Sequence, residues 1–110
     1  MNIFHKNQAK IASKYKIIKT IERTHTSSAS SFEYSDSDIS IVKDDTGKLY
    51  LRVYEKNCAS EANGRPITTV SDICYPIEKA EKVTSKNWVK VMISHFDAEI
   101  VLKKESYCGV

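Results

Sequence analysis

The residue types that most often bind metals are present in this chain, but without metal-site spacing. Cys58, Cys74, Cys108 and His95 are candidate zinc ligands. Zinc sites normally contain close pairs such as Cys-x2-Cys, which one turn presents to the ion. The cysteines of this chain stand 16 and 34 residues apart. We therefore expect no metal site and interpret the cysteines as small, partly buried thiols, although the sequence leaves room for one disulfide.

Nucleophilic catalysis also lacks a recognisable pattern. It requires Ser, Cys or Thr next to a base that a third group orients. His25 stands between two threonines ahead of a serine run, and His95 precedes Asp97. The sequence contains no Gly-x-Ser-x-Gly elbow, P-loop or dinucleotide fingerprint among its 3 glycines. We expect a protein that is not an enzyme and needs no cofactor.

One stretch does show a pattern typical of a binding surface. Apolar and polar side chains alternate over residues 48–54, as in a strand with one buried face. We expect the outward side chains to be Tyr50, Arg52 and Tyr54. Two tyrosines flanking an arginine are typical of protein–protein hot spots, and they can also stack on unpaired bases. The alternative is that a helix covers this face and the tyrosines simply pack.

A second candidate surface is basic. The whole chain carries 17 Lys+Arg and 14 Asp+Glu, for a net charge of +3. Residues 1–24 hold six basic groups and one acid, whereas residues 25–47 hold five acids and one lysine. Lys6, Lys10 and Lys14 recur every four residues, which places them on one side of a helix. Such a face could contact phosphates or an acidic protein, or it could simply be solvated.

The element that would carry these lysines is a helix from about residue 3 to 18, within a basic helical segment over residues 1–22. Its apolar face would contain Phe4, Ile11, Tyr15 and Ile18. A strand through residues 14–23 competes with this helix, because the segment is rich in β-branched residues. A serine-rich loop is expected at residues 27–37.

The rest of the chain predicts a sheet built from hairpins over residues 38–104. A turn at Asp44–Gly47 joins the first two strands, because glycine adopts the positive φ that such a turn needs. The later predictions are a loop at 56–66, a strand at Ile67–Tyr75, a short helical turn or loop at 77–86, and a second hairpin formed by Trp88–Phe96 and Glu99–Lys104 around Asp97-Ala98.

The expected fold class is α+β, with an N-terminal helix packed on a mainly antiparallel sheet of four to six strands, in one domain spanning residues 1–110. Trp88 and Met92 would lie under the helix. The expected core is Ile11, Tyr15, Ile18, Ile41, Leu49, Leu51, Val53, Val89, Val91, Ile93, Ile100 and Leu102. No apolar run is long enough to span a membrane, and residues 1–10 lack the apolar core of a secretory signal. We therefore expect an intracellular, cytoplasmic protein.

These features favour a non-enzymatic binding module that inhibits or occludes a protein partner, as immunity proteins, inhibitors and anti-defence proteins do. The residues expected to contact the partner are Tyr50, Arg52, Tyr54, Glu33, Asp36 and Asp38. The alternative function is a single-stranded nucleic-acid-binding domain that would use Tyr50, Arg52 and Tyr54 for stacking and Lys6, Lys10 and Lys14 for phosphates. The sequence specifies neither the partner nor the oligomeric state.

Overall fold

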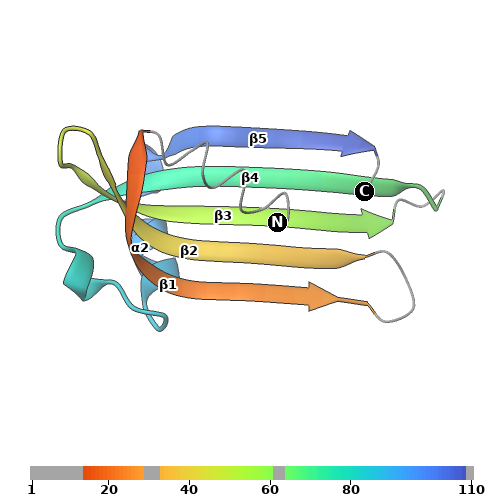
Figure 1. Cartoon of the computed structure of the whole chain (residues 1–110), viewed down its shortest axis with the longest axis horizontal. Helices are drawn as coiled ribbons and strands as arrows, with labels where there is room; N and C mark the ends of the chain where they lie inside the picture. Colours follow the sequence, from red (N-terminus) through yellow and green to blue (C-terminus); the bar gives the residue numbers. More distant parts are fainter. Residues whose placement is uncertain (1–13, 29–32, 61–63, 109–110) are drawn as a thin grey trace.

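The computed structural model describes residues 14–28, 33–60 and 64–108. Its main element is a five-stranded antiparallel sheet in which every strand pairs with its neighbours in the chain (Figure 1). The strands are β1 (Tyr15–Ser27), β2 (Tyr34–Asp44), β3 (Leu49–Ser60), β4 (Pro66–Ile77) and β5 (Ile100–Cys108). The predicted antiparallel, hairpin-based sheet is confirmed.

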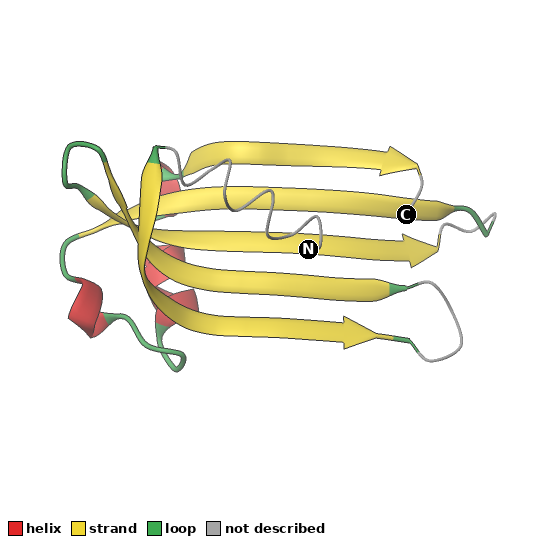
Figure 2. Ribbon diagram, viewed as in Figure 1, coloured by secondary structure: helices red, strands yellow, loops and turns green. Residues whose placement is uncertain are grey.

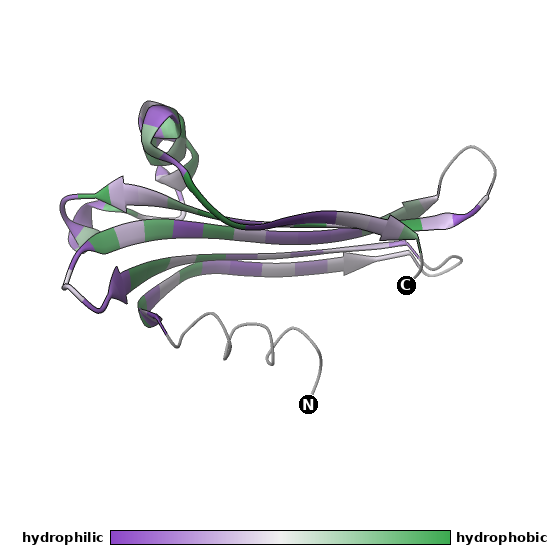
Figure 3. Ribbon diagram, turned by 90° about the horizontal axis from the view of Figure 1, so that it is seen from above, coloured by the Kyte–Doolittle hydropathy of each residue, from purple (hydrophilic) through white to green (hydrophobic). Residues whose placement is uncertain are grey.

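Within the described residues, the helical elements lie in the connection between β4 and β5 (Figure 2). They are η1 (Ala80–Lys82), α2 (Trp88–Ser94) and η2 (Phe96–Ala98). Seen from above, α2 stands on one side of the sheet, over one end of the strands (Figure 3). We call the side that carries α2 the helix-side face and the other side the opposite face.

The turn between β2 and β3 forms as the sequence predicts. Gly47 has a φ of 91°, in the left-handed region that glycine adopts without a steric penalty. One Asp44 carboxylate oxygen accepts hydrogen bonds from the backbone N–H groups of Thr46 and Lys48, at 2.9 and 3.0 Å. The aspartate thus satisfies the turn's backbone donors, while the glycine permits its geometry.

The core on the helix-side face consists of Ile39, Ile41, Leu51, Val53, Tyr75 and Val83. Trp88, Val91 and Met92 of α2 pack against it, and their spacing of three and four residues places them on one side of the helix. Val83 is 2% exposed, and its carbonyl accepts a hydrogen bond from Lys19 Nζ of β1 at 3.3 Å. The segment between β4 and β5 therefore covers the core on this face and is hydrogen-bonded to the edge strand β1.

The predicted N-terminal helix is wrong where the structure tests it. Residues 3–13 lie outside the described residues, but Tyr15–Ile18, the end of the predicted helix, belong to β1. The competing prediction, a strand through residues 14–23, is confirmed. The β-branched residues of this segment favour an extended chain, and pairing with β2 supplies the backbone hydrogen bonds that a helix would otherwise make.

The second predicted hairpin is also wrong. Trp88–Ser94 is the helix α2 rather than a strand, and Asp97 lies in η2. Its second half is confirmed, because β5 begins at Ile100. Tertiary packing overrides local preference here: Trp88, Val91 and Met92 gain burial on the sheet only if this stretch is helical.

Two predicted loops are shorter than expected. Tyr34–Ser37 of the serine-rich segment lies in β2, and Lys56–Ser60 of the predicted 56–66 loop lies in β3. The predicted strand at Ile67–Tyr75 is confirmed within β4, and η1 supplies the short helical turn expected at 77–86. Long pairing between β2 and β3 extends both strands beyond what their sequences suggest.

The predicted core is correct in its centre and wrong at its margins. Ile41, Leu51, Val53 and Tyr15 are buried, and Leu49, Val91 and Leu102 are partly buried. Ile11 lies outside the described residues. The remaining four residues are exposed: Ile18, Val89, Ile93 and Ile100. Trp88 and Met92 are part of a helix rather than strand residues beneath one.

Candidate functional site

The surface expected from Tyr50, Arg52 and Tyr54 does not exist as predicted. The three residues share the opposite face of β3, as their alternation requires, but they are 5%, 1% and 1% exposed. They pack on that face, in agreement with the alternative reading that these tyrosines are packing residues. A partner cannot contact side chains that are this completely buried, so the prediction that they point to solvent is wrong.

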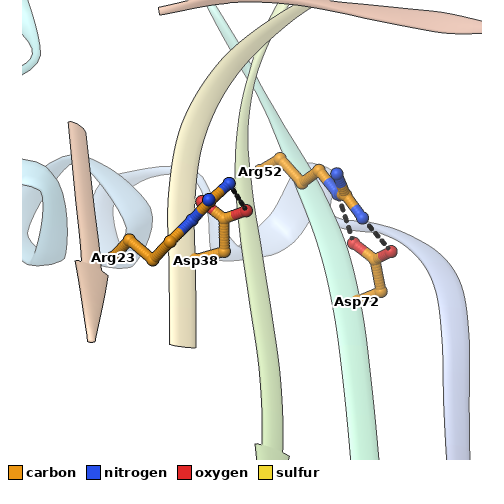
Figure 4. Close-up of polar contacts among 4 residues, drawn as sticks. All are labelled: Arg23, Asp38, Arg52 and Asp72. Carbon is orange, nitrogen blue, oxygen red and sulfur yellow. Dashed lines mark hydrogen bonds and ion pairs between the residues drawn. The ribbon is translucent and has the colours of Figure 1, made fainter. Parts of the chain in front are cut away.

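Arg52 is instead half of a buried ion pair. Its Nε and one terminal nitrogen each donate a hydrogen bond to a different oxygen of Asp72, both at 2.9 Å (Figure 4). The two side chains are 2% and 0% exposed. Burial lowers the pKa of Arg52, but the hydrogen bonds and charge of Asp72 outweigh it, so the net shift is upward. The guanidinium also lies 5.6 Å from the centre of the Tyr54 ring.

A second ion pair continues this arrangement across the sheet. Arg23 of β1 donates to Asp38 of β2 at 3.3 Å, and Arg52 and Asp72 follow on β3 and β4 (Figure 4). Asp38, which was expected to contact a partner, is 1% exposed and offers almost no surface in this structure. Four charges of alternating sign therefore occupy four consecutive strands, and we call them the charge row.

The other two acidic residues predicted to bind a partner already have contacts within the chain. Asp36 contacts His25 of β1. Glu33 accepts a hydrogen bond from the backbone N–H of Ser60 at 3.1 Å. Both residues are half-buried. Asp36 lies on the opposite face with Tyr50, Arg52 and Tyr54 but is less buried than they are.

Tyr50 has a local structural role. Its hydroxyl donates to the second carboxylate oxygen of Asp44 at 2.8 Å. Burial and this hydrogen bond raise the pKa of Tyr50 to about 12. Hydrogen bonds from Thr46, Tyr50 and Lys48 lower the pKa of Asp44 well below its usual range, against a smaller effect of burial. Tyr50 therefore anchors the β2–β3 turn.

The predicted basic surface is only partly within the described residues. Lys6 and Lys10 lie outside them. Lys14 is exposed, and its ammonium lies 5.5 Å from the centre of the Tyr15 ring. No helix follows Lys14, since β1 begins at the next residue.

The structure reveals a different candidate surface on the connection between β4 and β5. Val89, Ile93 and Phe96 are 46%, 57% and 50% exposed. Val89 and Ile93 are one helical turn apart on α2, so they share a side of the helix that faces away from Trp88, Val91 and Met92. Phe96 follows in η2, where one side of its ring lies 6.0 Å from the Tyr75 ring, measured between the centroids. We call these three exposed residues, Val89, Ile93 and Phe96, the apolar ridge.

Three lysines lie close in sequence to the helical part of the apolar ridge, and the exposed Asp97 follows Phe96. The segment from residue 82 to residue 96 contains Lys82, Lys86 and Lys90 and no aspartate or glutamate. All three lysines are exposed. Lys90 is three residues from Ile93, so the two side chains are neighbours on the helix surface. The helical spacing of these apolar residues is present in the sequence. The prediction of a strand at residues 88–96 placed Val89 and Ile93 in the core, so this surface was not predicted.

The described ranges contain no cluster of three His, Cys, Asp or Glu that could hold a metal ion, and all three cysteines are unpaired. None of the described helices is long and apolar enough to cross a membrane. An open hollow of about 270 Å³ lies along β3, β4 and β5, lined by Glu55, Asn57, Thr69, Val70, Ser71, Lys104, Glu105 and Ser106.

Comparison of the chain with protein-family models, with curated proteins and with solved structures gives no match. A functional assignment must therefore come from the geometry of the chain itself.

Proposed function

We propose that this chain is a non-enzymatic binding module that inhibits or occludes a protein partner, and that the apolar ridge contacts that partner. One observation supports the proposal above the others: three large apolar side chains are half exposed together on one short segment. Isolated exposed apolar residues are ordinary, whereas grouped ones mark interaction sites.

The composition of the ridge favours a protein partner over a nucleic acid. Val89 and Ile93 are aliphatic and cannot stack on bases, which is how single strands are usually held. The stacking residues of the nucleic-acid alternative were Tyr50, Arg52 and Tyr54, and their burial removes them from such a role. A short apolar helix face that fills a pocket or groove is a common mode of protein recognition.

The charges around the ridge define the partner further. Lys82, Lys86 and Lys90 are exposed, with no carboxylate between residues 82 and 96. The partner surface is therefore apolar in its centre and acidic at its rim, because complementary charge speeds encounter and rejects wrong partners. The affinity should fall moderately as salt screens the rim.

The test requires a captured partner and a matched control variant. A photo-crosslinking residue at position 93 should attach the partner in lysate from the source cell after nuclease treatment, and the same residue at position 18 should not. Ile18 is a suitable control because it is 44% exposed but lies on β1.

Affinity measurements then test the contact energetically. Ile93→Ala should weaken binding about 30-fold if Ile93 is a hot spot, whereas Ile18→Ala should leave the affinity unchanged. Alanine is a good helix former, so α2 should remain intact. Equal affinities for the two variants, or crosslinking from position 18 alone, would contradict the assignment of the ridge.

A further inference from the structure

A second group of side chains, at the far end of the opposite face, has the composition of an anion site. Lys56 of β3 is flanked on that face by Tyr34 of β2 and Tyr107 of β5. The strand register places them there: Tyr34 is opposite Cys58, which shares a face with Lys56, and Tyr107 is opposite Thr68. Lys56 is half-buried, and Tyr107 is 41% exposed.

Lys56 differs from three other cations of the opposite face. Arg23, Arg52 and Lys103 each contact a carboxylate, at 3.3, 2.9 and 3.8 Å. The residue opposite Lys56 in the register is Asp36, but Asp36 contacts His25 instead. Lys56 makes no ion pair within the described part of the chain. A half-buried ammonium without a carboxylate is available to an anion from outside.

The neighbours of Lys56 are hydrogen-bonding phenols. The Tyr34 and Tyr107 side chains both interact electrostatically with its ammonium. Burial lowers the pKa of Lys56, but these contacts with tyrosines raise it overall, so the side chain remains a cation. A phenol that accepts a hydrogen bond from the ammonium still has its own proton to donate. Ammonium and phenols together can therefore serve one oxyanion.

Exposed rings lie beside this group. The His25 ring stacks on the Tyr34 ring with 6.4 Å between the centroids, and the His25 side chain is 61% exposed. The nearest carboxylates are already engaged, Asp36 by His25 and Glu105 by Lys103. The outer ring face can therefore accept a planar group next to the oxyanion position.

We propose that Lys56, Tyr34 and Tyr107 bind the phosphate of a nucleotide, whose base stacks on the exposed His25 ring. The nucleotide is either free or one unit of a single strand, since both present the same phosphate and base. This site is separate from the apolar ridge, because it lies on the other face of the sheet.

NMR titration of the full-length ¹⁵N-labelled chain tests the proposal with four probes: inorganic phosphate, uridine, uridine 5′-monophosphate and an oligothymidylate. The monophosphate should bind more tightly than phosphate or uridine, with shift changes at the amides of Tyr34, Lys56 and Tyr107. Tighter binding of the oligothymidylate would identify the single strand as the source, and equal binding the free nucleotide. No shift changes at these amides with any probe would overturn the site.

Variants separate the site from general charge effects. Lys56→Gln should weaken monophosphate binding about tenfold, because it removes a charged hydrogen-bond donor. Tyr107→Phe should weaken it less while leaving the ring in place. Lys104→Gln makes the same charge change on the helix-side face and should have no effect. Equal losses for Lys56→Gln and Lys104→Gln would refute the site, and dispersed amide spectra would verify that each variant folds.

Discussion

Replacement of Asp72 should destabilise this protein more than any exposed charge change. Asp72 is 0% exposed and receives two hydrogen bonds from Arg52, whose side chain is 2% exposed. Asp72→Asn leaves the guanidinium buried without its counter-charge. Removing one partner of a buried ion pair costs about 3–5 kcal/mol. The free energy of unfolding of a small domain is about 5–15 kcal/mol, so the variant should be close to unfolded at moderate urea concentrations.

The assay is urea unfolding followed by circular dichroism, with Glu105→Gln as the matched control. Glu105 pairs with Lys103 at 3.8 Å, but the Glu105 side chain is 51% exposed and the Lys103 side chain 33%. An exposed pair is worth about 0–1 kcal/mol, so the control should shift the midpoint little. A constant slope of the unfolding free energy against urea would show that the change is one of stability.

A double variant tests whether the cost comes from the unpaired charge. Arg52→Leu combined with Asp72→Leu removes both charges and keeps apolar volume, so it should recover most of the stability lost in Asp72→Asn. A cost of Asp72→Asn no greater than that of Glu105→Gln would contradict this prediction, because the pair would then be hydrated in solution. A double variant less stable than Asp72→Asn would also contradict it.

Three further predictions concern the turn and the thiols. Spectrophotometric titration should show Tyr50 ionising near pH 12. Because its pKa is raised on folding, the stability it contributes is complete below about pH 10, the ordinary pKa of tyrosine, and is lost as the pH rises from there through the folded-state pKa of about 12. Tyr50→Phe, which removes the 2.8 Å hydrogen bond to Asp44, should abolish this loss and cost about 1 kcal/mol in urea unfolding. Gly47→Ala should cost about 1 kcal/mol, because the backbone has a φ of 91° at a position where a Cβ meets no other atom; an unchanged unfolding midpoint would show that the turn adopts another conformation. A thiol reagent should modify Cys108 alone in the folded protein, because the other two thiols are buried and burial raises the pKa of Cys74 to about 12; mass spectrometry showing more than one adduct before unfolding would contradict this.

The parts of the fold that the sequence predicts correctly are the ones that local chemistry decides. The β2–β3 hairpin follows from an alternating pattern on each side of a turn with Asp44 and Gly47. Both its register and its turn are determined within the same short stretch of chain. The strand at Ile67–Tyr75 is similar, because β-branched residues fill it.

The α2 segment shows where local reasoning fails. Residues 88–94 satisfy an alternating pattern and a helical pattern at once, since apolar residues occupy most positions. The choice between the two patterns depends on the sheet beneath, which Trp88, Val91 and Met92 cover. That surface is built from β2, β3 and β4, so its shape cannot be derived from residues 88–94 alone.

The candidate site was mislocated for a related reason. Alternation correctly places Tyr50, Arg52 and Tyr54 on one side of β3, but it does not specify which side is covered. Both faces of β3 are buried over these residues, and the polar side chains there pair with one another. The exposed apolar surface lies instead on the segment between β4 and β5, at Val89 and Ile93, two residues that the alternating pattern predicts to be in the core.

The charge row has a consequence for the alignment of the strands. A slip of one residue between two strands would turn every side chain to the wrong face, so the apolar pattern alone prevents it. A slip of two residues preserves the faces and exchanges one β-branched side chain for another, which costs little. In this sheet the same slip would separate Arg52 from Asp72, two buried charges that would each lose their counter-charge, and would also separate the half-exposed Arg23 from the buried Asp38. The ion pairs therefore favour the native strand register over registers shifted by two residues, which the burial of apolar side chains alone would not disfavour.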